Sequence, residues 1–542
     1  MPPPAAFAIR CSGPYLSARA SSSRPGKRLQ KATSRLDNIE LTFLGTSSGS
    51  PSLTRNQQAL TVQLGGQTWQ FDCGEATQHK MMQTSLAPPA VKRVFISHLH
   101  GDHCFGLPGF LCNMATAYGG GEDGDGRGRS EIDETPVTIV GPEGLRSWLR
   151  AVLGNSYATL GRMKLEVHEL VGMRAIENER QRRMRPPVYV RDPLPCEVPG
   201  LDLEPCADGV WRIPERLDAS GRSLDPPMSI SAVELDHTVP TVGWVLQEAP
   251  RAGTLDGARV KPLLQAQGVH LRNLKRLKDG ESLKLPDGTV LNPSDFMGSS
   301  TSRKLCILSD MRGAKVNSTL YDEIADANLI VHECTNAFLP DAPESRSPRD
   351  VEMIARRHGH STPQMAGRLA RQARARHLVL THFSPRYGGG RSAGERRVME
   401  AIRKHAEREF AGGDQGERSG GGVTAAADLM RISVQINGRV DVDDSLILGR
   451  GAVGSAYGGA YGGAYGSSGS SEDDPAGLEA GPDEPERLER MQDGVEVSMQ
   501  DTDEIGAVEQ EGEQPDPIIE RAEEPPPPPA RRPRGRPRKN KE

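Results

Sequence analysis

The chain has 542 residues with a formal net charge of −5, and only 4% of them are aromatic. The length and the many Gly and Pro residues predict that part of the chain lies outside a packed core. No apolar run approaches the roughly 18 residues of a membrane span, which excludes a membrane-spanning protein and predicts no membrane partner. The eight cysteines form no CxxC pair, which argues against a disulfide framework and favours a reducing compartment.

The N-terminus has the composition of a targeting segment. Residues 1–36 contain seven Lys or Arg and no acid, and Ser and Ala are frequent among them. This composition is typical of an organellar transit peptide, and a basic, unfolded N-terminus is the alternative. We expect a chloroplast protein, with the mitochondrion as the alternative. The basic C-terminus leaves a nuclear or cytosolic location as a third interpretation.

The first half of the chain alternates between strand-like and helix-like patterns, with two segments that interrupt them. The expected elements are the strands 39–44, 60–64, 68–71, 91–96 and 137–140 and the helix 106–118. The interrupting segments, 119–135 and 173–228, are predicted as insertions, and the second is rich in Arg and Pro. Strands that alternate with helices and are buried on both sides predict an α/β layered fold.

The strand pattern returns in the second half. The expected elements are strands at 232–248, 303–310, 328–333, 377–382 and 429–434 and a helix at 395–410. Between them, residues 249–290 are basic and Gly-rich, and the segment 274–288 resembles a short hairpin. Several of these strands end in a metal-capable side chain, which is where α/β sheets carry their sites.

The composition changes after residue 436. Residues 437–471 are predicted as a flexible linker rich in Gly, Ala, Tyr and Ser. Residues 472–524 hold 20 acidic and 3 basic side chains, a net −17, and are predicted to be disordered. The Pro-rich, basic tail 525–542 contains RGRP (534–537), which resembles an AT-hook and predicts binding to A·T-rich DNA. A nuclear-import signal and an unspecific RNA-binding tail are the alternatives.

The stretch ISHLHGDH (96–103) predicts a metal site. His98, His100, Asp102 and His103 offer imidazole nitrogens and carboxylate oxygens, which are ligands of zinc. Three further candidates follow later strands: His237, Asp310 and His382. Each histidine taken alone has a structural interpretation, whereas the cluster favours a metal. Seven ligands suit two zinc ions with a shared bridge, and such a pair can activate one water for phosphodiester hydrolysis.

The HxHxDH pattern resembles the metallo-β-lactamase superfamily, which implies an αββα sandwich with a binuclear metal site at one edge of its sheets. Further motifs, in the same order along the chain, resemble ribonuclease Z, the tRNA 3′ processing endonuclease, in its short, plant organellar form. These motifs are FLGTSSGSP (43–51), DHTVP (236–240), HECT (332–335), GHST (359–362) and THFSPRY (381–387). The resemblance covers about residues 37–436.

The resemblance implies a role for each candidate residue. One zinc ion would be held by His98, His100 and His237, the other by Asp102, His103 and His382, with Asp310 as the bridge, giving two Zn²⁺ per subunit. Asp102 would also accept a proton from the attacking water. His360, polarised by Glu333, would protonate the leaving 3′ oxygen. The implied substrate contacts are Thr46, Ser47, Ser361, Thr362 and Arg386.

The chain departs from the family pattern at three places. Asp310 stands in Ser-Asp-Met where the family has Gly-Asp-Thr, and HECTN (332–336) lacks the family's final Phe. The family's protruding tRNA-binding arm carries Gly-Pro at its tip, whereas the candidate arm here, 249–290, has no such pair in its basic stretch 266–278. Its Lys and Arg residues predict contacts to tRNA phosphates. The short form of the family also implies a homodimer.

These features lead to one hypothesis and two alternatives. The leading hypothesis is a zinc-dependent endoribonuclease that removes the 3′ trailer from precursor tRNA after the discriminator base and leaves a 3′ hydroxyl. The second is another hydrolase of the superfamily, which acts on a small ester or phosphodiester. The third is an inactive tRNA- or nucleoid-binding protein, and the presence of all seven ligands argues against it.

Overall fold

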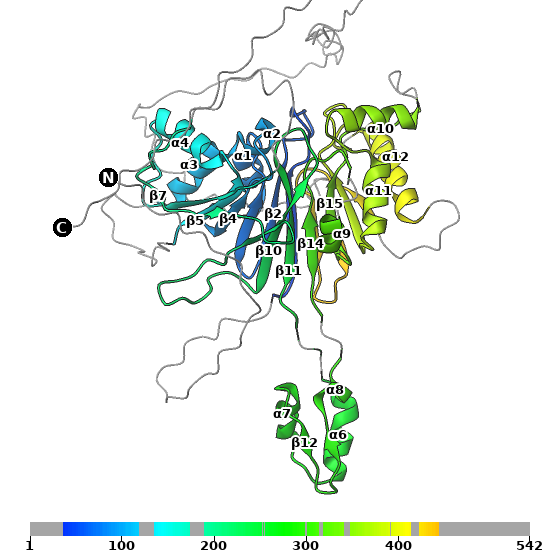
Figure 1. Ribbon diagram of the computed structural model, residues 1–542. Coiled ribbons are helices and arrows are strands. Elements are labelled where there is room, and N and C mark those ends of the chain that lie inside the picture. Colours follow the sequence, from blue (N-terminus) through cyan, green and yellow to red (C-terminus); the bar gives the residue numbers. More distant parts are fainter. Residues whose placement is uncertain are drawn as a thin grey trace, which may run out of the picture. The chain divides into compact units, whose positions relative to one another are not determined.

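The computed structural model describes residues 36–443, apart from 119–134, 174–188, 252, 254, 299–300, 314–317, 341–346, 391 and 413–421. Two β-sheets pack face to face and carry helices on their outer faces (Figure 1). This αββα sandwich confirms the predicted fold class. Residues 1–35 of the predicted transit peptide, most of the first insertion, the linker beyond residue 443, the acidic segment and the basic tail lie outside the described residues. Leu36, the last residue of the predicted peptide, is described and packs in the main core.

The first sheet has ten strands in the order β19-β18-β1-β2-β3-β4-β5-β6-β7, and β8 also pairs with β6. β1 pairs antiparallel with β2 and β18, whereas β3 to β6 run parallel to one another. The strands are β1 (Ile39–Gly45), β2 (Ala59–Leu64), β3 (Gln67–Phe71), β4 (Val91–Phe95), β5 (Val137–Pro142), β6 (Leu165–Leu170), β7 (Glu197–Val198), β8 (Asp202–Leu203), β18 (Arg431–Val434) and β19 (Val440–Asp443).

The second sheet has seven strands in the order β17-β16-β15-β14-β11-β10-β9. β14 to β17 run parallel, and β9 to β11 form an antiparallel half. The strands are β9 (Val210–Ile213), β10 (Met228–Leu235), β11 (Thr241–Glu248), β14 (Lys304–Ile307), β15 (Leu329–Glu333), β16 (His377–Thr381) and β17 (Gly422–Ala425). The single run predicted at 232–248 is thus a hairpin of β10 and β11 that turns at the DHTVP motif.

Helices cover the outer faces of both sheets. On the first sheet they are α1 (Thr77–Met81), α2 (Gly101–Cys104), α3 (Leu107–Tyr118) and α4 (Leu145–Asn155), and the 3₁₀ turn η1 (Pro88–Ala90) lies between α1 and β4. On the second sheet they are α9 (Ser318–Ile324), α11 (Pro363–Gln372) and α12 (Ala393–Phe410), and α10 (Pro348–Arg357) directly precedes the GHST motif. The start of α12 is fixed by a capping box, in which Ser392 and Glu395 satisfy each other's backbone N–H groups.

The main hydrophobic core lies between the two sheets. Aromatic side chains from both sheets meet there, and the rings of Phe95 and Trp244 lie 5.0 Å apart between centroids. Strands such as β1 are buried on both faces because the inter-sheet core lies on one side and helices lie on the other. The strand ends are therefore held rigidly, which is what a site built on them requires.

Three segments differ from the sequence predictions. Residues 440–443, expected in the linker, form β19 and pair with β18, so the folded region extends beyond residue 436. The second insertion is only partly an insertion, because its described residues supply β7, β8 and β9 to the two sheets. In the expected hairpin 274–288, the first residues form a helix, and the second strand of the small sheet lies at 290–291.

The candidate arm folds as a small unit in the connection between β11 and β14. It contains α6 (Gly257–Ala266), η2 (Leu271–Asn273), α7 (Leu274–Lys278), β12 (Leu283–Lys284), β13 (Val290–Leu291) and α8 (Pro293–Phe296). Its hydrophobic cluster is made only of residues from 255 to 297, with Val260, Leu264 and Leu277 fully buried. At its root, Arg251 and Thr301 exchange backbone hydrogen bonds. None of the helices in the described parts of the chain is long and apolar enough to cross a membrane.

Candidate metal centre

The seven predicted ligands all follow the ends of strands. His98 and His100 lie in the loop after β4, and Asp102 and His103 belong to the short helix α2. The other three ligands, His237, Asp310 and His382, follow β10, β14 and β16. The first and last of the seven residues lie 284 positions apart in the sequence, and the structure brings all seven into two groups of potential ligand atoms. A third group, Asp310, His360 and His382, shares one residue with each of the two.

The first group consists of His98, His100, His237 and Asp310. His100 Nδ1 lies 3.1 Å from His98 Nε2 and 3.3 Å from His237 Nε2. Both Nε2 atoms lie 3.8 Å from Asp310 Oδ2. Burial lowers the pKa of His98 and His100, and it lowers that of His237 to about 4. The three rings are therefore neutral, which is the form that binds a metal.

The second group consists of Asp102, His103 and His382, with Asp310 beside it. The Nε2 atoms of His103 and His382 lie 3.1 Å apart, and Asp102 Oδ2 lies 3.2 Å from His382 Nε2. The other carboxylate oxygen of Asp310, Oδ1, lies 3.5 Å from His103 Nε2. Asp310 thus directs one oxygen to each group, which is the position of a bridging ligand.

The donor atoms fit zinc. The ligands of a tetrahedral zinc ion, at about 2.0–2.1 Å from the metal, lie roughly 3.3 Å from one another, close to the 3.1–3.3 Å between the imidazole nitrogens of both groups. Burial would raise the pKa of Asp310, but His382 and His103 hold it well below its ordinary value. Burial would also lower the pKa of His103, but nearby carboxylates, Asp310 first, raise it. The carboxylates of Asp310 and Asp102 thus place negative charge among the imidazole rings, which suits a divalent cation.

Hydrogen bonds on the far side of the rings fix their orientation. His103 Nδ1–H donates to Asp72 Oδ2 at 2.8 Å, and His237 Nδ1–H donates to the carbonyl of Gly359 at 2.8 Å. Gly359 has a φ of 88°, and a Cβ there would lie 2.6 Å from His237 Nδ1, so the GHST motif needs glycine at this position. Such outer partners direct Nε2 toward the site and raise ligand basicity.

Two orienting residues were not assigned a role from the sequence. Asp72 accepts hydrogen bonds from the backbone and the hydroxyl of Ser97 as well as from His103. Thr335 lies 3.0 Å from His382 Nδ1 through its Oγ1 and donates to Glu333 Oε2 at 2.7 Å. The signal for Asp72 was its place in DCGE (72–75), directly after a strand, and that for Thr335 was its place in HECT.

Glu333 and His360 form a pair at the edge of the ligand cluster. His360 Nδ1 lies 3.3 Å from Glu333 Oε1 and 3.7 Å from Asp310 Oδ2. The buried Glu333 also accepts the backbone N–H of Met311 at 2.7 Å. Burial would lower the pKa of His360, but the carboxylate of Glu333 and its hydrogen bond raise that pKa to about 9. The pair therefore offers a protonated imidazole beside the ligands.

Four of the five predicted substrate contacts have buried side chains that bond to the protein itself, so a contact with substrate stays a prediction for them. Their side chains maintain the walls of the site. Thr46 donates to Asp428, and Ser47 donates to the carbonyl of Ser50. In the GHST motif, Ser361 donates to the carbonyl of Met311, and Thr362 caps the N-terminus of α11. The exposed fractions of these four residues are 0–1%.

Arg386 is the exposed member of the predicted contacts. Its guanidinium lies 2.9 Å from Asn336 Oδ1 and over the ring of Tyr387. The loop that carries it is anchored by the buried Arg55, which donates to the carbonyls of Tyr387 and Gly388. Arg55 also donates to Thr46 Oγ1 at 2.7 Å, so one guanidinium joins the first motif of the chain to the last.

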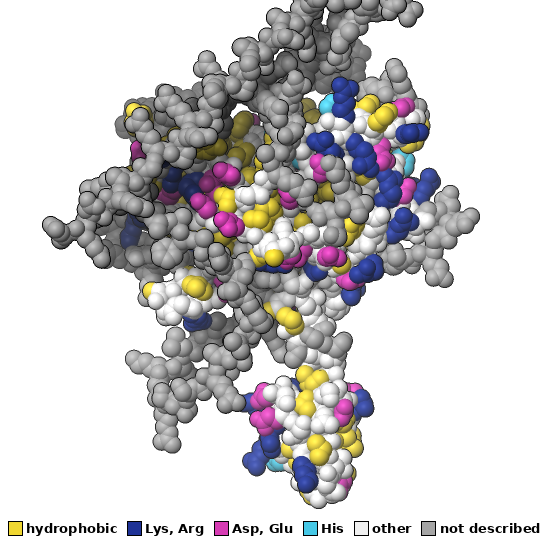
Figure 2. Space-filling model, viewed as in Figure 1, with side chains coloured by type: hydrophobic (Ala, Val, Ile, Leu, Met, Phe, Trp, Pro, Cys, Tyr) yellow, Lys and Arg dark blue, Asp and Glu magenta, His cyan; other side chains and the backbone are white. Residues whose placement is uncertain are grey.

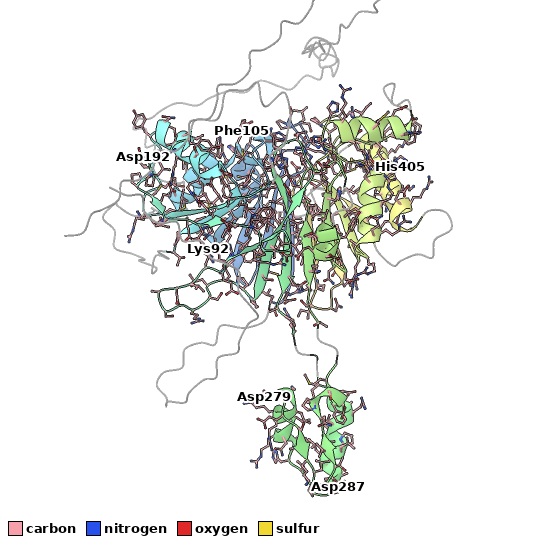
Figure 3. The ribbon with its side chains drawn as sticks, viewed as in Figure 1. Lys92, Phe105, Asp192, Asp279, Asp287 and His405 are labelled. Atoms are coloured by element: carbon pink, nitrogen blue, oxygen red, sulfur yellow. The ribbon has the colours of Figure 1, made fainter. Side chains whose placement is uncertain are left out.

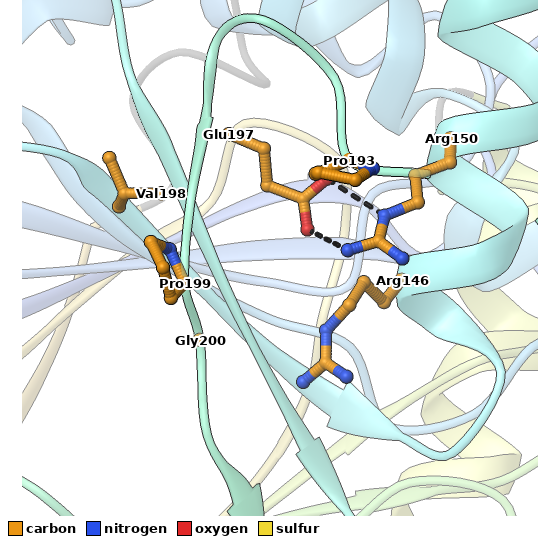
Figure 4. A pocket seen from close by; sticks show the side chains of 7 residues that line it. All are labelled: Arg146, Arg150, Pro193, Glu197, Val198, Pro199 and Gly200. Atoms are coloured by element: carbon orange, nitrogen blue, oxygen red, sulfur yellow. Dashed lines mark hydrogen bonds and ion pairs between the residues drawn. The ribbon is translucent and has the colours of Figure 1, made fainter. Parts of the chain in front are cut away.

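A cavity of about 300 Å³ beside α4 is lined by arginines and a carboxylate and contains none of the candidate metal ligands (Figure 4). Arg150 Nε donates to Glu197 Oε2 at 2.8 Å. Arg146 pairs with Glu169 and Asp202 at 3.2 and 2.9 Å. Because carboxylates already neutralise both guanidinium groups, these arginines join α4 to β6, β7 and β8 and are not an anion site.

Comparison with known proteins identifies the family. A family model described as Anti-Pycsar protein Apyc1 matches residues 39–121. Zinc phosphodiesterase ELAC protein 1 of Homo sapiens is 33% identical over 405 residues, which cover 73% of this chain and 99% of that protein. Ribonuclease Z of Bacillus cereus (strain G9842) is 33% identical over 356 residues, which cover 65% of this chain and 90% of that protein.

Among solved structures, human tRNase Z, short form (ELAC1), matches with 26% identity and a TM-score of 0.43 over 72% of this chain and 98% of that chain. The chain matches these sequence relatives over 90–99% of their own length. The chain therefore belongs to the ribonuclease Z family, which includes the zinc phosphodiesterases named ELAC protein 1.

Proposed function

We propose that this protein is a zinc-dependent endoribonuclease that removes the 3′ trailer from precursor tRNA. The cut falls after the discriminator base and leaves a 3′ hydroxyl. The observation that carries the proposal is the Glu333–His360 pair, which lies beside the ligand cluster and supplies a proton donor next to it. Family membership supports the choice of tRNA, since the relatives are named ribonuclease Z and zinc phosphodiesterase.

Two zinc ions per subunit fit the two ligand groups. His98, His100 and His237 would hold one ion and Asp102, His103 and His382 would hold the other, and Asp310 has a carboxylate oxygen near each group. Zinc supplies Lewis acidity, which lowers the pKa of water and neutralises charge on phosphoryl oxygens. The protein supplies fixed ligand positions, because each imidazole is oriented by a hydrogen bond or by burial at a strand end.

Asp102 and His360 carry the proton transfers in this mechanism. Asp102 Oδ2 accepts the backbone N–H of Gly49 at 2.6 Å, which fixes the carboxylate that receives a proton from the attacking water. His360 donates its proton to the leaving 3′ oxygen. Glu333 holds the imidazole through Nδ1, so Nε2 is the nitrogen available to the substrate. The raised pKa of His360 keeps the donor charged at neutral pH.

Exposed arginines and lysines provide the contacts to RNA phosphates. Arg386 lies in the loop next to the ligand His382, and bidentate guanidinium geometry suits a phosphate. Lys and Arg side chains also gather over α10–α12 and on the candidate arm (Figure 2). In the arm, the exposed cations are Arg259, Lys261, Arg272, Lys275, Arg276, Lys278 and Lys284. We propose that the arm binds tRNA through phosphates and serves the active site of a second copy in a homodimer.

The proposal also includes the cellular location of the protein and the binding of A·T-rich DNA by its C-terminal tail. The basic, acid-free segment 1–36 supports import into the chloroplast, with the mitochondrion as the alternative. The tail with RGRP (534–537) supports contact with A·T-rich DNA. Deletion of residues 525–542 tests the tail: binding of A·T-rich DNA falls if the proposal is right, and equal binding by the full and the truncated chain contradicts it.

A comparison of substrates tests the main proposal against a hydrolase of small phosphodiesters. The full chain is given precursor tRNA and a chromogenic phosphodiester, and kcat/KM is measured for each with zinc present. We expect kcat/KM for precursor tRNA to exceed that for the small ester by at least about 10³-fold, because binding energy from the rest of the tRNA is used in the transition state. Turnover of the small ester alone contradicts the proposal.

A further inference from the structure

An exposed aromatic ring adjoins the metal ligands. Phe105 directly follows α2, two residues after His103, and 64% of its surface is exposed. Figure 3 shows it at the same edge of the sandwich as α2 (labelled in Figure 1). Among the described residues, the other exposed large aromatic side chains are Tyr157 and Tyr189, which lie outside the ligand loops. An isolated exposed ring does not by itself indicate a binding site, so the residues around Phe105 determine whether it is one.

The ring of Phe105 is held in place on both sides. It lies against Gly101, where a Cβ would come within 2.5 Å of Phe105 Cε2. Gly101 separates the ligands His100 and Asp102 in the chain, so the ring rests on the ligand loop itself. The ring of Trp148 stacks near it at 6.4 Å between centroids and an interplanar angle of 16°. Trp148 is partly buried in the core under α4, which fixes the pair.

The direction of the RNA strand relates this ring to one nucleotide. In the proposed reaction, the discriminator nucleotide carries the leaving 3′ oxygen, and that oxygen faces His360. The scissile phosphate stays attached to the first nucleotide of the trailer. His360 follows α10 and lies beside Glu333 and Asp310. Phe105 instead follows α2, which carries the ligands Asp102 and His103. In Figure 1, α2 lies on one side of the strand ends that carry the ligands, and the end of α10 lies on the other side.

We propose that Phe105, backed by Trp148, is a stacking subsite for the unpaired base of the first trailer nucleotide, next to the scissile phosphate. The inference rests on the proposed function, because it requires a single-stranded RNA segment across the site. An aromatic face accepts any of the four bases, since every base has a π-face, so this subsite binds trailers with little sequence preference. The subsite positions the substrate and takes no part in the proton transfers.

The subsite is tested by combining a substitution of Phe105 with a precursor tRNA that lacks the base at the first trailer position. The full chain with zinc and its Phe105→Ala variant are assayed on two precursor tRNAs, which differ only by a base or an abasic residue at the first trailer position. We expect Phe105→Ala to raise KM roughly tenfold on the normal precursor and to leave kcat nearly unchanged, because stacking binds ground and transition states alike. On the abasic precursor the two enzymes should give the same KM. Phe105→Tyr should behave as the unsubstituted chain, and Tyr189→Ala serves as the control for loss of an exposed ring.

Several results would overturn the subsite. One is an equal loss on both precursors, and another is no loss on either. A third is a fall in molecular mass of Phe105→Ala by light scattering, which would place the ring at an interface between copies. Zinc content, measured on each variant, shows whether the ligand loop is intact. If the unsubstituted chain cuts neither precursor, the proposed function itself fails, and that outcome is distinct from the other three.

Discussion

The Nδ1 atom of His360 lies 3.3 Å from Oε1 of Glu333, and the carboxylate of Glu333 is fully buried. This relationship makes Glu333 the residue that keeps His360 protonated. Replacement of Glu333 by Gln removes the charge and preserves the shape. We expect kcat on precursor tRNA to fall about 10²-fold or more, since general acid catalysis contributes 10²–10⁴-fold.

The same variant carries a pH signature. The carboxylate of Glu333 raises the pKa of His360 to about 9, so the neutral amide lets that pKa fall. The alkaline limb of the kcat profile, where His360 loses its proton, should therefore move to lower pH in Glu333→Gln. Glu352→Gln, which changes a surface ion pair on α10, is the matched control. An alkaline limb that stays in place would show that Glu333 does not govern the proton donor.

Asp310 is predicted to decide how many zinc ions the chain holds. Its two oxygens face different ligand groups, so Asp310→Asn weakens both sites. We expect native mass spectrometry to find two zinc ions in the unsubstituted chain and fewer in the variant, with kcat lower by at least about 10³-fold because the electrostatic stabilisation is lost. Retention of two zinc ions and full activity in Asp310→Asn would remove the bridging role.

Asp72 is predicted to tune the affinity of the second zinc site. Its Oδ2 accepts the Nδ1–H of His103, and Asp72→Asn leaves only a weaker, neutral acceptor. Loss of such an outer partner lowers metal affinity or activity by about 10–100-fold. Competition with a zinc chelator measures the affinity, and Asp326→Asn in an exposed ion pair is the control. Unchanged affinity in Asp72→Asn would mean that packing alone orients His103.

The sequence predicted that the seven candidate ligands gather at one site, because each follows an apolar run typical of a strand and parallel strands deliver their ends to one edge. It did not predict the roles of Thr46, Ser47, Ser361 and Thr362. Polar residues in a Gly-rich loop or a helix cap look alike whether they point to substrate or to the backbone, and here they bond to the protein itself. Whether such a side chain faces the substrate or the backbone depends on packing between segments that are far apart in the sequence.

Short edge strands escaped prediction for a related reason. β7 and β8 have two residues each and lie in Pro-rich sequence, so they carry no periodic pattern. β19 reads VDVD and lies at the start of the segment predicted as a linker from its composition, but its register with β18 places Arg431 opposite Asp443. The helix α7 was read as a strand of a hairpin because LKRLK is too short to show a helical period. For β7, β8 and β19, tertiary pairing overrides weak local preference.

Stability should depend on pH through His168, which is remote from the ligands. It is 4% exposed, and its Nδ1 accepts the backbone N–H of Leu201 at 2.9 Å. Burial, aided by Arg93 and Arg146, lowers its pKa from 6.5 to about 4. The unfolded chain therefore binds a proton at higher pH than the folded one. The stabilisation is fully present above about pH 6.5 and is lost as the pH falls toward 4.

The difference between the pKa of 6.5 for His168 in the unfolded chain and about 4 in the folded chain corresponds to about 3 kcal/mol of the free energy of unfolding. His168→Gln keeps an acceptor but does not titrate, so its free energy of unfolding should change less between pH 7 and pH 4.5, by roughly 2 kcal/mol. Urea midpoints at several pH values provide the measurement, and His79→Gln on the surface is the control. Parallel pH curves for His168→Gln and the unsubstituted chain would contradict the assignment.

The most direct test of the central claim maps the cut on RNA. The full chain is incubated with end-labelled precursor tRNA and zinc, alongside His103→Ala and a chelator control, and the product ends are read to the nucleotide. The account predicts a single cut after the discriminator base with a 3′ hydroxyl, lost in the variant and with chelator. An intact precursor in the presence of zinc-loaded protein, or a cut at another position, would contradict it.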